Sequence, residues 1–162
     1  MSSAAIAQFV AHEESAARAL SDVATAADAL AVEASRRGDG AELARLRSFQ
    51  LSVAALAEAN KHRAAVWASL AAEQDKATHS PTPPPEFKQR ISDAASLDDL
   101  AAVVDDAEIG CAGVMVRGLG NLAGSAVRRQ VAQAVAAIGD GLALTRAAIG
   151  KDPTPWPGVP AG

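Results

Sequence analysis

The sequence predicts an all-α protein that folds as one four-helix bundle. Alanine, the strongest helix former, makes up about a quarter of the 162 residues. Aromatic residues make up only 3%, so side chains that favour β-strands are scarce. Apolar residues recur three and four positions apart in four long segments, which is the spacing of a helix with one buried face. We place the bundle in residues 1–150, as a single domain.

The first two predicted helices, residues 3–36 and 41–75, form an antiparallel hairpin. Ser2 or Ser3 can cap the first helix, and a short Gly-Asp-Gly link separates the two. At 1.5 Å per residue each helix is about 50 Å long. The expected inward positions are Ile6, Phe9, Val10, Glu13, Ala16, Ala17, Leu20, Val23, Ala24, Ala27, Leu30 and Ala34 in the first helix, and Leu43, Leu46, Phe49, Val53, Leu56, Ala57, Asn60, Ala64 and Trp67 in the second.

A proline-rich connector follows over residues 76–96. Its four prolines exclude a continuous helix. We expect Phe87 and Ile91 to pin it to the bundle, and the segment EFKQRIS can add one helical turn.

The third and fourth predicted helices cover residues 97–117 and 122–149. Ser96 and Asp99 have the spacing of a capping box at the start of the third. The expected inward positions are Leu97, Leu100, Ala101, Val104, Glu108, Cys111 and Met115, then Val127, Val131, Val135, Ile138, Leu142 and Ile149. The tail, residues 151–162, should be extended, with Trp156 docking it on the bundle.

The three links are short, long and short. Two hairpins joined by a long crossover give the topology of ferritin-like folds. About 20 extended residues reach roughly 66 Å, enough to cross a helix of this length. The alternative is a plain up-down-up-down bundle, which does not need so long a connector.

Polar residues interrupt the apolar faces on three helices. Carboxylates and imidazoles inside a bundle are the ligands of di-iron and di-manganese sites, and the candidates here are His12, Glu13, Glu58, His62 and Glu108. However, the acid and histidine of the second helix are four residues apart rather than three, and the fourth helix offers no inward ligand near its middle. We therefore expect a degenerate site with no cofactor, iron or manganese being the alternative, and no catalytic residue.

A structural interpretation of the same residues is that the buried glutamates pair with Arg or His from a neighbouring helix. Asn60 would then fix the helix register. Counting from the first loop puts residue 64 level with Glu13, whereas a crossing connector could place Glu108 at another height.

Composition excludes several classes of protein. The net charge of −4 and the absence of a basic stripe argue against nucleic-acid binding. No signal peptide and no apolar run long enough to span a membrane is present. The single cysteine, Cys111, suits a reducing, cytoplasmic location and should be a buried, inert thiol. No nucleophile or phosphate-binding motif is present.

The chain resembles an alanine-rich, ferritin-like domain family of unknown function from actinobacteria. The similar segments are, in order, AHEES, KHRAAVWASLAAE, the proline-rich connector, SLDDLAAVVDDAE and PWPGVP. The resemblance implies a ferritin-like bundle and carries no established activity.

These observations favour a non-enzymatic scaffold or interaction protein that self-associates, most simply as a homodimer, since long alanine-rich helices have wide apolar faces. The protein partner is unknown. One alternative is a metal-binding or oxidoreductase ferritin-like protein. Another is a carrier of a small apolar ligand, held in a cavity that alanine side chains leave between helices.

Overall fold

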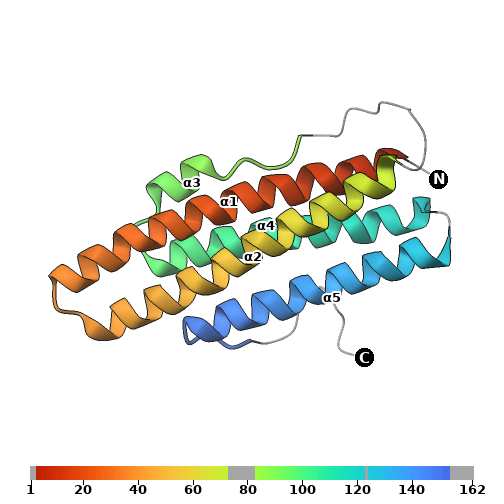
Figure 1. The fold of residues 1–162 in the computed structure, drawn as a ribbon. Coiled ribbons are helices and arrows are strands. Elements are labelled where there is room, and N and C mark those ends of the chain that lie inside the picture. The colour runs from red at the N-terminus through yellow and green to blue at the C-terminus, as the bar shows by residue number, and fades with distance from the viewer. Residues whose placement is uncertain (1–2, 73–82, 123, 154–162) are drawn as a thin grey trace.

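In the computed structural model, residues 3–72, 83–122 and 124–153 are described, and every regular element among them is a helix. The all-α prediction is therefore confirmed for this part of the chain. The elements are α1 (Ser3–Arg36), α2 (Gly40–Ala72), α3 (Lys88–Asp93), α4 (Leu97–Gly118), the short 3₁₀ helix η1 (Leu119–Asn121) and α5 (Ser125–Ala148). The four long helices lie side by side, with α3 on the outside (Figure 1).

The helices α1 and α2 form the expected antiparallel hairpin. Gly38 has φ +72°, a left-handed conformation that ends a helix readily because glycine has no Cβ. Asp39 Oδ1 then accepts a hydrogen bond of 3.0 Å from the Glu42 amide, which caps the start of α2.

The helices α2 and α4 run in the same direction, as Figure 1 shows. The Phe9 and Trp67 ring centroids are 5.5 Å apart, which places the end of α2 beside the start of α1. A Cβ built on Gly118 would lie 2.6 Å from the Phe9 ring, so the end of α4 lies there as well. The connector therefore returns along the bundle before α4 begins.

The returning connector is attached to α1. Ser15 Oγ donates a hydrogen bond of 3.3 Å to the Pro85 carbonyl oxygen. Phe87 and Ile91 are buried as predicted. The helix α3 (Lys88–Asp93) starts directly after Phe87 and includes Ile91, and it is the helical turn that the sequence allows.

The pair α4 and α5 is also antiparallel. Arg146, near the end of α5, forms an ion pair with Asp105 in α4, with Nη2 3.0 Å from Oδ2. The predicted cap of α4 is confirmed, because Ser96 Oγ accepts a hydrogen bond from the Asp99 amide. However, α5 begins at Ser125 rather than at residue 122: the chain first completes η1, and Gly124 then takes φ +93°.

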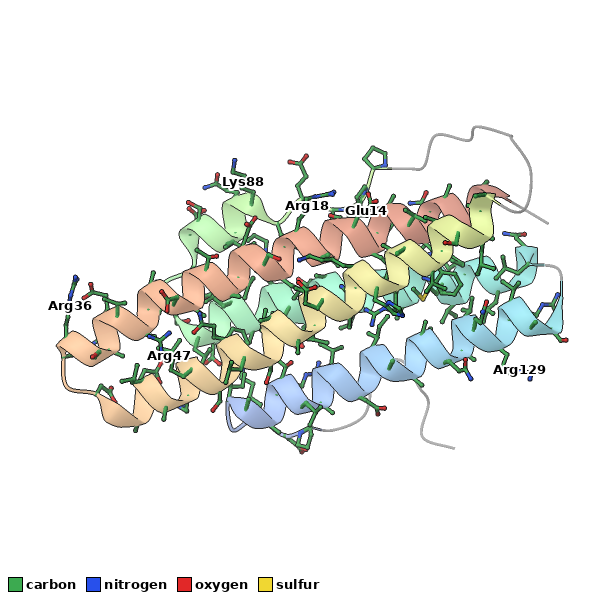
Figure 2. The ribbon with its side chains drawn as sticks, in the orientation of Figure 1. Glu14, Arg18, Arg36, Arg47, Lys88 and Arg129 are labelled. Atoms are coloured by element: carbon green, nitrogen blue, oxygen red, sulfur yellow. The ribbon has the colours of Figure 1, made fainter. Side chains whose placement is uncertain are left out.

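Most of the predicted inward positions form one buried core. All the expected positions of α4 are buried, and in α2 only Leu43 is partly exposed. Charged side chains such as Arg18, Arg36, Lys88 and Arg129 lie on the outer surface (Figure 2). No helix in the described ranges is both long and apolar enough to cross a membrane. The predicted end of the second helix at residue 75 and the docking of Trp156 fall outside these ranges.

Candidate functional site

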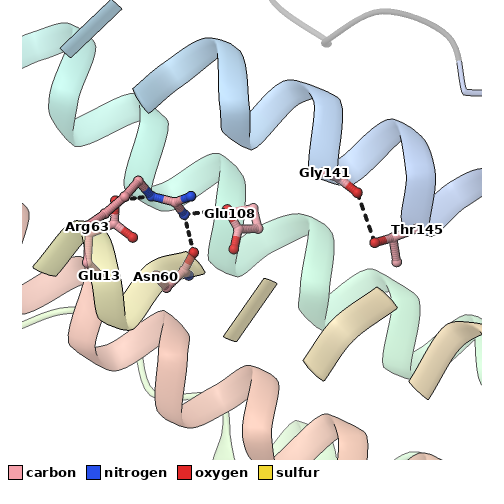
Figure 3. Close-up of polar contacts among 6 residues, drawn as sticks. All are labelled: Glu13, Asn60, Arg63, Glu108, Gly141 and Thr145. Atoms are coloured by element: carbon pink, nitrogen blue, oxygen red, sulfur yellow. Dashed lines mark hydrogen bonds and ion pairs between the residues drawn. The ribbon is translucent and has the colours of Figure 1, made fainter. Parts of the chain in front are cut away.

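The interior of the bundle contains one charged cluster, centred on Arg63 of α2. Its Nε donates a hydrogen bond of 2.7 Å to Glu13 Oε1 in α1. Its Nη2 lies 3.3 Å from Glu108 Oε2 in α4 and also donates to Asn60 Oδ1, one turn earlier in α2. One guanidinium thus joins three helices (Figure 3).

The helical repeat explains why an arginine lies here. Arg63 follows Asn60 by three positions and precedes Trp67 by four, so all three side chains lie on one face of α2. That face is the buried one, since Asn60 and Trp67 are both buried. Arg63 extends along this face, and its side chain is 11% exposed.

Glu108 is level with Glu13 because α4 is shorter than α1 and ends beside the start of α1. Glu13 lies ten residues after Ser3, and Glu108 lies ten residues before Gly118, at the other end of its helix. The expectation that a crossing connector would shift Glu108 to another height is therefore wrong. The expected alignment of Glu13 with residue 64 holds, since its partner is Arg63.

The cluster contains two buried carboxyl groups and one largely buried guanidinium. Glu13 and Glu108 are both fully buried. Burial and, to a smaller extent, Glu13 raise the pKa of Glu108 to about 7, against the lowering effects of Arg63 and Asn60. Burial also raises the pKa of Glu13, which Arg63 and Trp67 oppose. One proton on the two acids would make the cluster neutral, and the raised pKa of Glu108 favours that proton on Glu108 up to about neutral pH.

Each glutamate also faces a neutral donor. The Trp67 indole lowers the pKa of Glu13, and the Asn60 amide lowers that of Glu108. Neither contact has the alignment of a good hydrogen bond. Four buried atoms in the cluster consequently lack a partner among the described residues: Glu13 Oε2, Asn60 Nδ2, Trp67 Nε1 and Glu108 Oε1.

Cys111 lies one turn after Glu108 on the same helix and is buried. Burial raises the pKa of its thiol, and Glu13 and Glu108 raise it further, more than Arg63 lowers it. The raised pKa favours the neutral thiol, and the prediction that Cys111 is buried is confirmed.

The structure brings together only two of the five predicted metal ligands, Glu13 and Glu108. Glu58 is 73% exposed and pairs with Lys61 at 2.6 Å, and His62 is exposed. His12 is half-buried in a separate groove beside Arg117, where burial and that cation lower its pKa. Within the described ranges, no three His, Cys, Asp or Glu side chains converge closely enough to bind a metal.

Arg63 lies where a metal would need to be. One oxygen of each glutamate contacts its guanidinium, so the donor set does not fit a di-iron or di-manganese centre. The alternative expectation, that the buried glutamates pair with an arginine of a neighbouring helix, is confirmed. Arg63 was not among the predicted site residues, and its spacing from Asn60 and Trp67 indicated only that it adjoins the buried face of α2.

The chain matches no family model, and no curated protein or solved structure is significantly similar to it.

Proposed function

We propose that this protein is a ferritin-like bundle in which an arginine has taken the place of the metal, and that it acts as a self-associating scaffold or interaction protein in the cytoplasm. The observation that carries the proposal is the position of Arg63 between Glu13 and Glu108. The shared direction of α2 and α4 supports the ferritin-like topology.

The arginine can perform the structural task of the metal without its chemistry. A metal in a bundle core joins helices by neutralising their carboxylates, and Arg63 joins α1, α2 and α4 in the same way. A guanidinium remains protonated at any physiological pH and has no redox states, so it holds the helices and transfers no electrons.

Self-association is supported by two large apolar side chains in contact with water. Leu51 of α2 is 74% exposed and Leu144 of α5 is 68% exposed. A Cβ built on Gly141 would lie 2.4 Å from the Leu56 side chain, so α2 and α5 are neighbours here and the two leucines lie at a similar level. Each leaves an apolar side chain in water that a second copy can cover.

Metal analysis tests the absence of metal chemistry. The purified protein is measured before and after incubation with Fe(II) or Mn(II), and its thermal midpoint is recorded with and without each metal. We expect well under one metal per chain and an unchanged midpoint. Stoichiometric metal that disappears in Glu13→Gln would overturn the proposal and favour the metal-binding alternative.

Light scattering after size-exclusion chromatography tests self-association. We expect the mass of a dimer for the natural sequence and of a monomer for the double variant Leu51→Glu, Leu144→Glu. Val32→Glu, which alters a less exposed apolar residue of α1, is the matched control and should remain dimeric. A monomeric natural protein would refute this part of the proposal.

A further inference from the structure

We propose that the groove between α2 and α5 binds a small, neutral, largely apolar molecule that carries one hydrogen-bond-accepting oxygen, and that Arg63 donates to this oxygen. The groove has a volume of about 390 Å³, within the range of small-molecule sites. Its lining includes Arg63, Val66, Trp67 and Ala137, with His62 and Gln130 as polar members.

Small side chains leave this space between the two helices. Ala59 of α2 and Ala134 and Ala137 of α5 all line the groove, and each presents only a methyl group. Val66 and the Trp67 ring supply larger apolar surfaces on the α2 side. These residues give an apolar ligand a surface that removes it from water.

Arg63 has hydrogen-bonding capacity left over at this groove. A guanidinium carries five N–H donors. Nε serves Glu13, and Nη2 serves Asn60 and Glu108. The third nitrogen, Nη1, donates to no described residue. The buried polar atoms without a partner do not include Nη1, so this nitrogen is not fully buried. It therefore reaches the surface, and Arg63 lines the groove.

Charge selects a neutral ligand. Glu13 and Glu108 already provide two acids for the single guanidinium, so an anionic ligand would add a further negative group that this cation does not balance. A cationic ligand would lie against Arg63 itself. A carbonyl, ether or hydroxyl oxygen accepts from Nη1 without adding charge.

Three ring-matched probes test the proposal: cyclohexanone, cyclohexanecarboxylate and cyclohexylammonium. The chain has two tryptophans, so the variant Trp156→Phe leaves Trp67 as the only indole N–H signal in a ¹H–¹⁵N correlation spectrum. At pH 7.5 we expect cyclohexanone to shift this signal saturably, with a Kd in the low millimolar range suited to so few atoms. Both charged probes should bind at least tenfold more weakly.

A second experiment tests the proposal by filling the groove with a larger side chain. Ala137→Leu places a larger side chain in the groove and should weaken cyclohexanone binding at least tenfold. Ala136→Leu, an exposed neighbour on α5 outside the groove, should leave the affinity within twofold. Ala136 and Ala137 are both exposed, so both variants should fold. Equal binding to the two variants, absence of saturation, or tighter binding of either charged probe would overturn the proposal. None of these results depends on metal content or on the oligomeric state.

Discussion

Replacing Glu108 with glutamine should change how the stability of this protein depends on pH. The carboxyl group of Glu108 is buried, and its pKa is raised from 4.5 to about 7. In the unfolded chain the same group titrates near 4.5, so between these values the folded state holds more protons. Stability therefore falls as pH rises from about 4.5 to about 7 and stays low above it. The variant Glu108→Gln keeps the shape of the protonated acid and cannot ionise.

The size of the effect follows from the shift. Each pKa unit corresponds to about 1.4 kcal/mol. Of the pH range over which stability falls, about two pH units lie above pH 5. We therefore expect Glu108→Gln to gain about 2 to 3 kcal/mol relative to the natural protein between pH 5 and pH 8. The glutamine also removes a negative neighbour of Glu13, which acts in the same direction.

Urea denaturation followed by circular dichroism at pH 5, 6, 7 and 8 measures this difference, with equal slopes in urea as the condition for comparing the two proteins. Glu58→Gln is the control, because Glu58 is an exposed carboxylate on the surface of α2. Its free energy of unfolding should stay within about 0.5 kcal/mol of the natural protein at every pH. A difference between Glu108→Gln and the natural protein that is constant with pH, or that shrinks as pH rises, would refute the assignment of the proton to Glu108.

Three further outcomes follow from the structure. Arg63→Met should lower the free energy of unfolding by about 3 to 5 kcal/mol at pH 8, because it leaves two buried acids without a cation. In the same urea assay, adding Glu108→Gln to this variant should restore part of the lost free energy. Gly118→Ala should destabilise the protein by about 1 to 3 kcal/mol, since its Cβ would lie 2.6 Å from the Phe9 ring. The control Gly110→Ala, with no atom within 4 Å of its Cβ, should stabilise α4 by up to about 1 kcal/mol. Ser96→Ala should lose the cap of α4 and about 1 kcal/mol, and an unchanged thermal midpoint would contradict the capping role.

The sequence predicted most of the fold because local rules decide it. Apolar periodicity identified the buried face of each long helix, and Ser96 and Asp99 marked the start of α4. The exact start of α5 was less accessible, because the 3₁₀ helix η1 (Leu119–Asn121) follows α4 and Gly124, with φ +93°, directly precedes α5. Periodicity also placed Glu13 and Glu108 inside the bundle, where both are buried.

The nature of the cluster could not be predicted from those stripes alone. A stripe is defined by apolar residues, so a long cationic side chain at its edge is read as solvated even when its charged end turns inward. Arg63 is such a residue: it adjoins the buried stripe of α2, and only the positions of Glu13 and Glu108 in space direct its guanidinium into the core.

The same reasoning explains why a proton and an arginine can take the place of a metal here. Two buried carboxylates carry two negative charges, and a divalent cation would balance both. Arg63 balances one, and the raised pKa of Glu108 favours a proton that balances the other up to about neutral pH. The core thus reaches neutrality without any ion from solution, and the helices are joined whether or not metal is present. Iron or manganese could be bound by both glutamates at this cluster only if Arg63 first moved away from them.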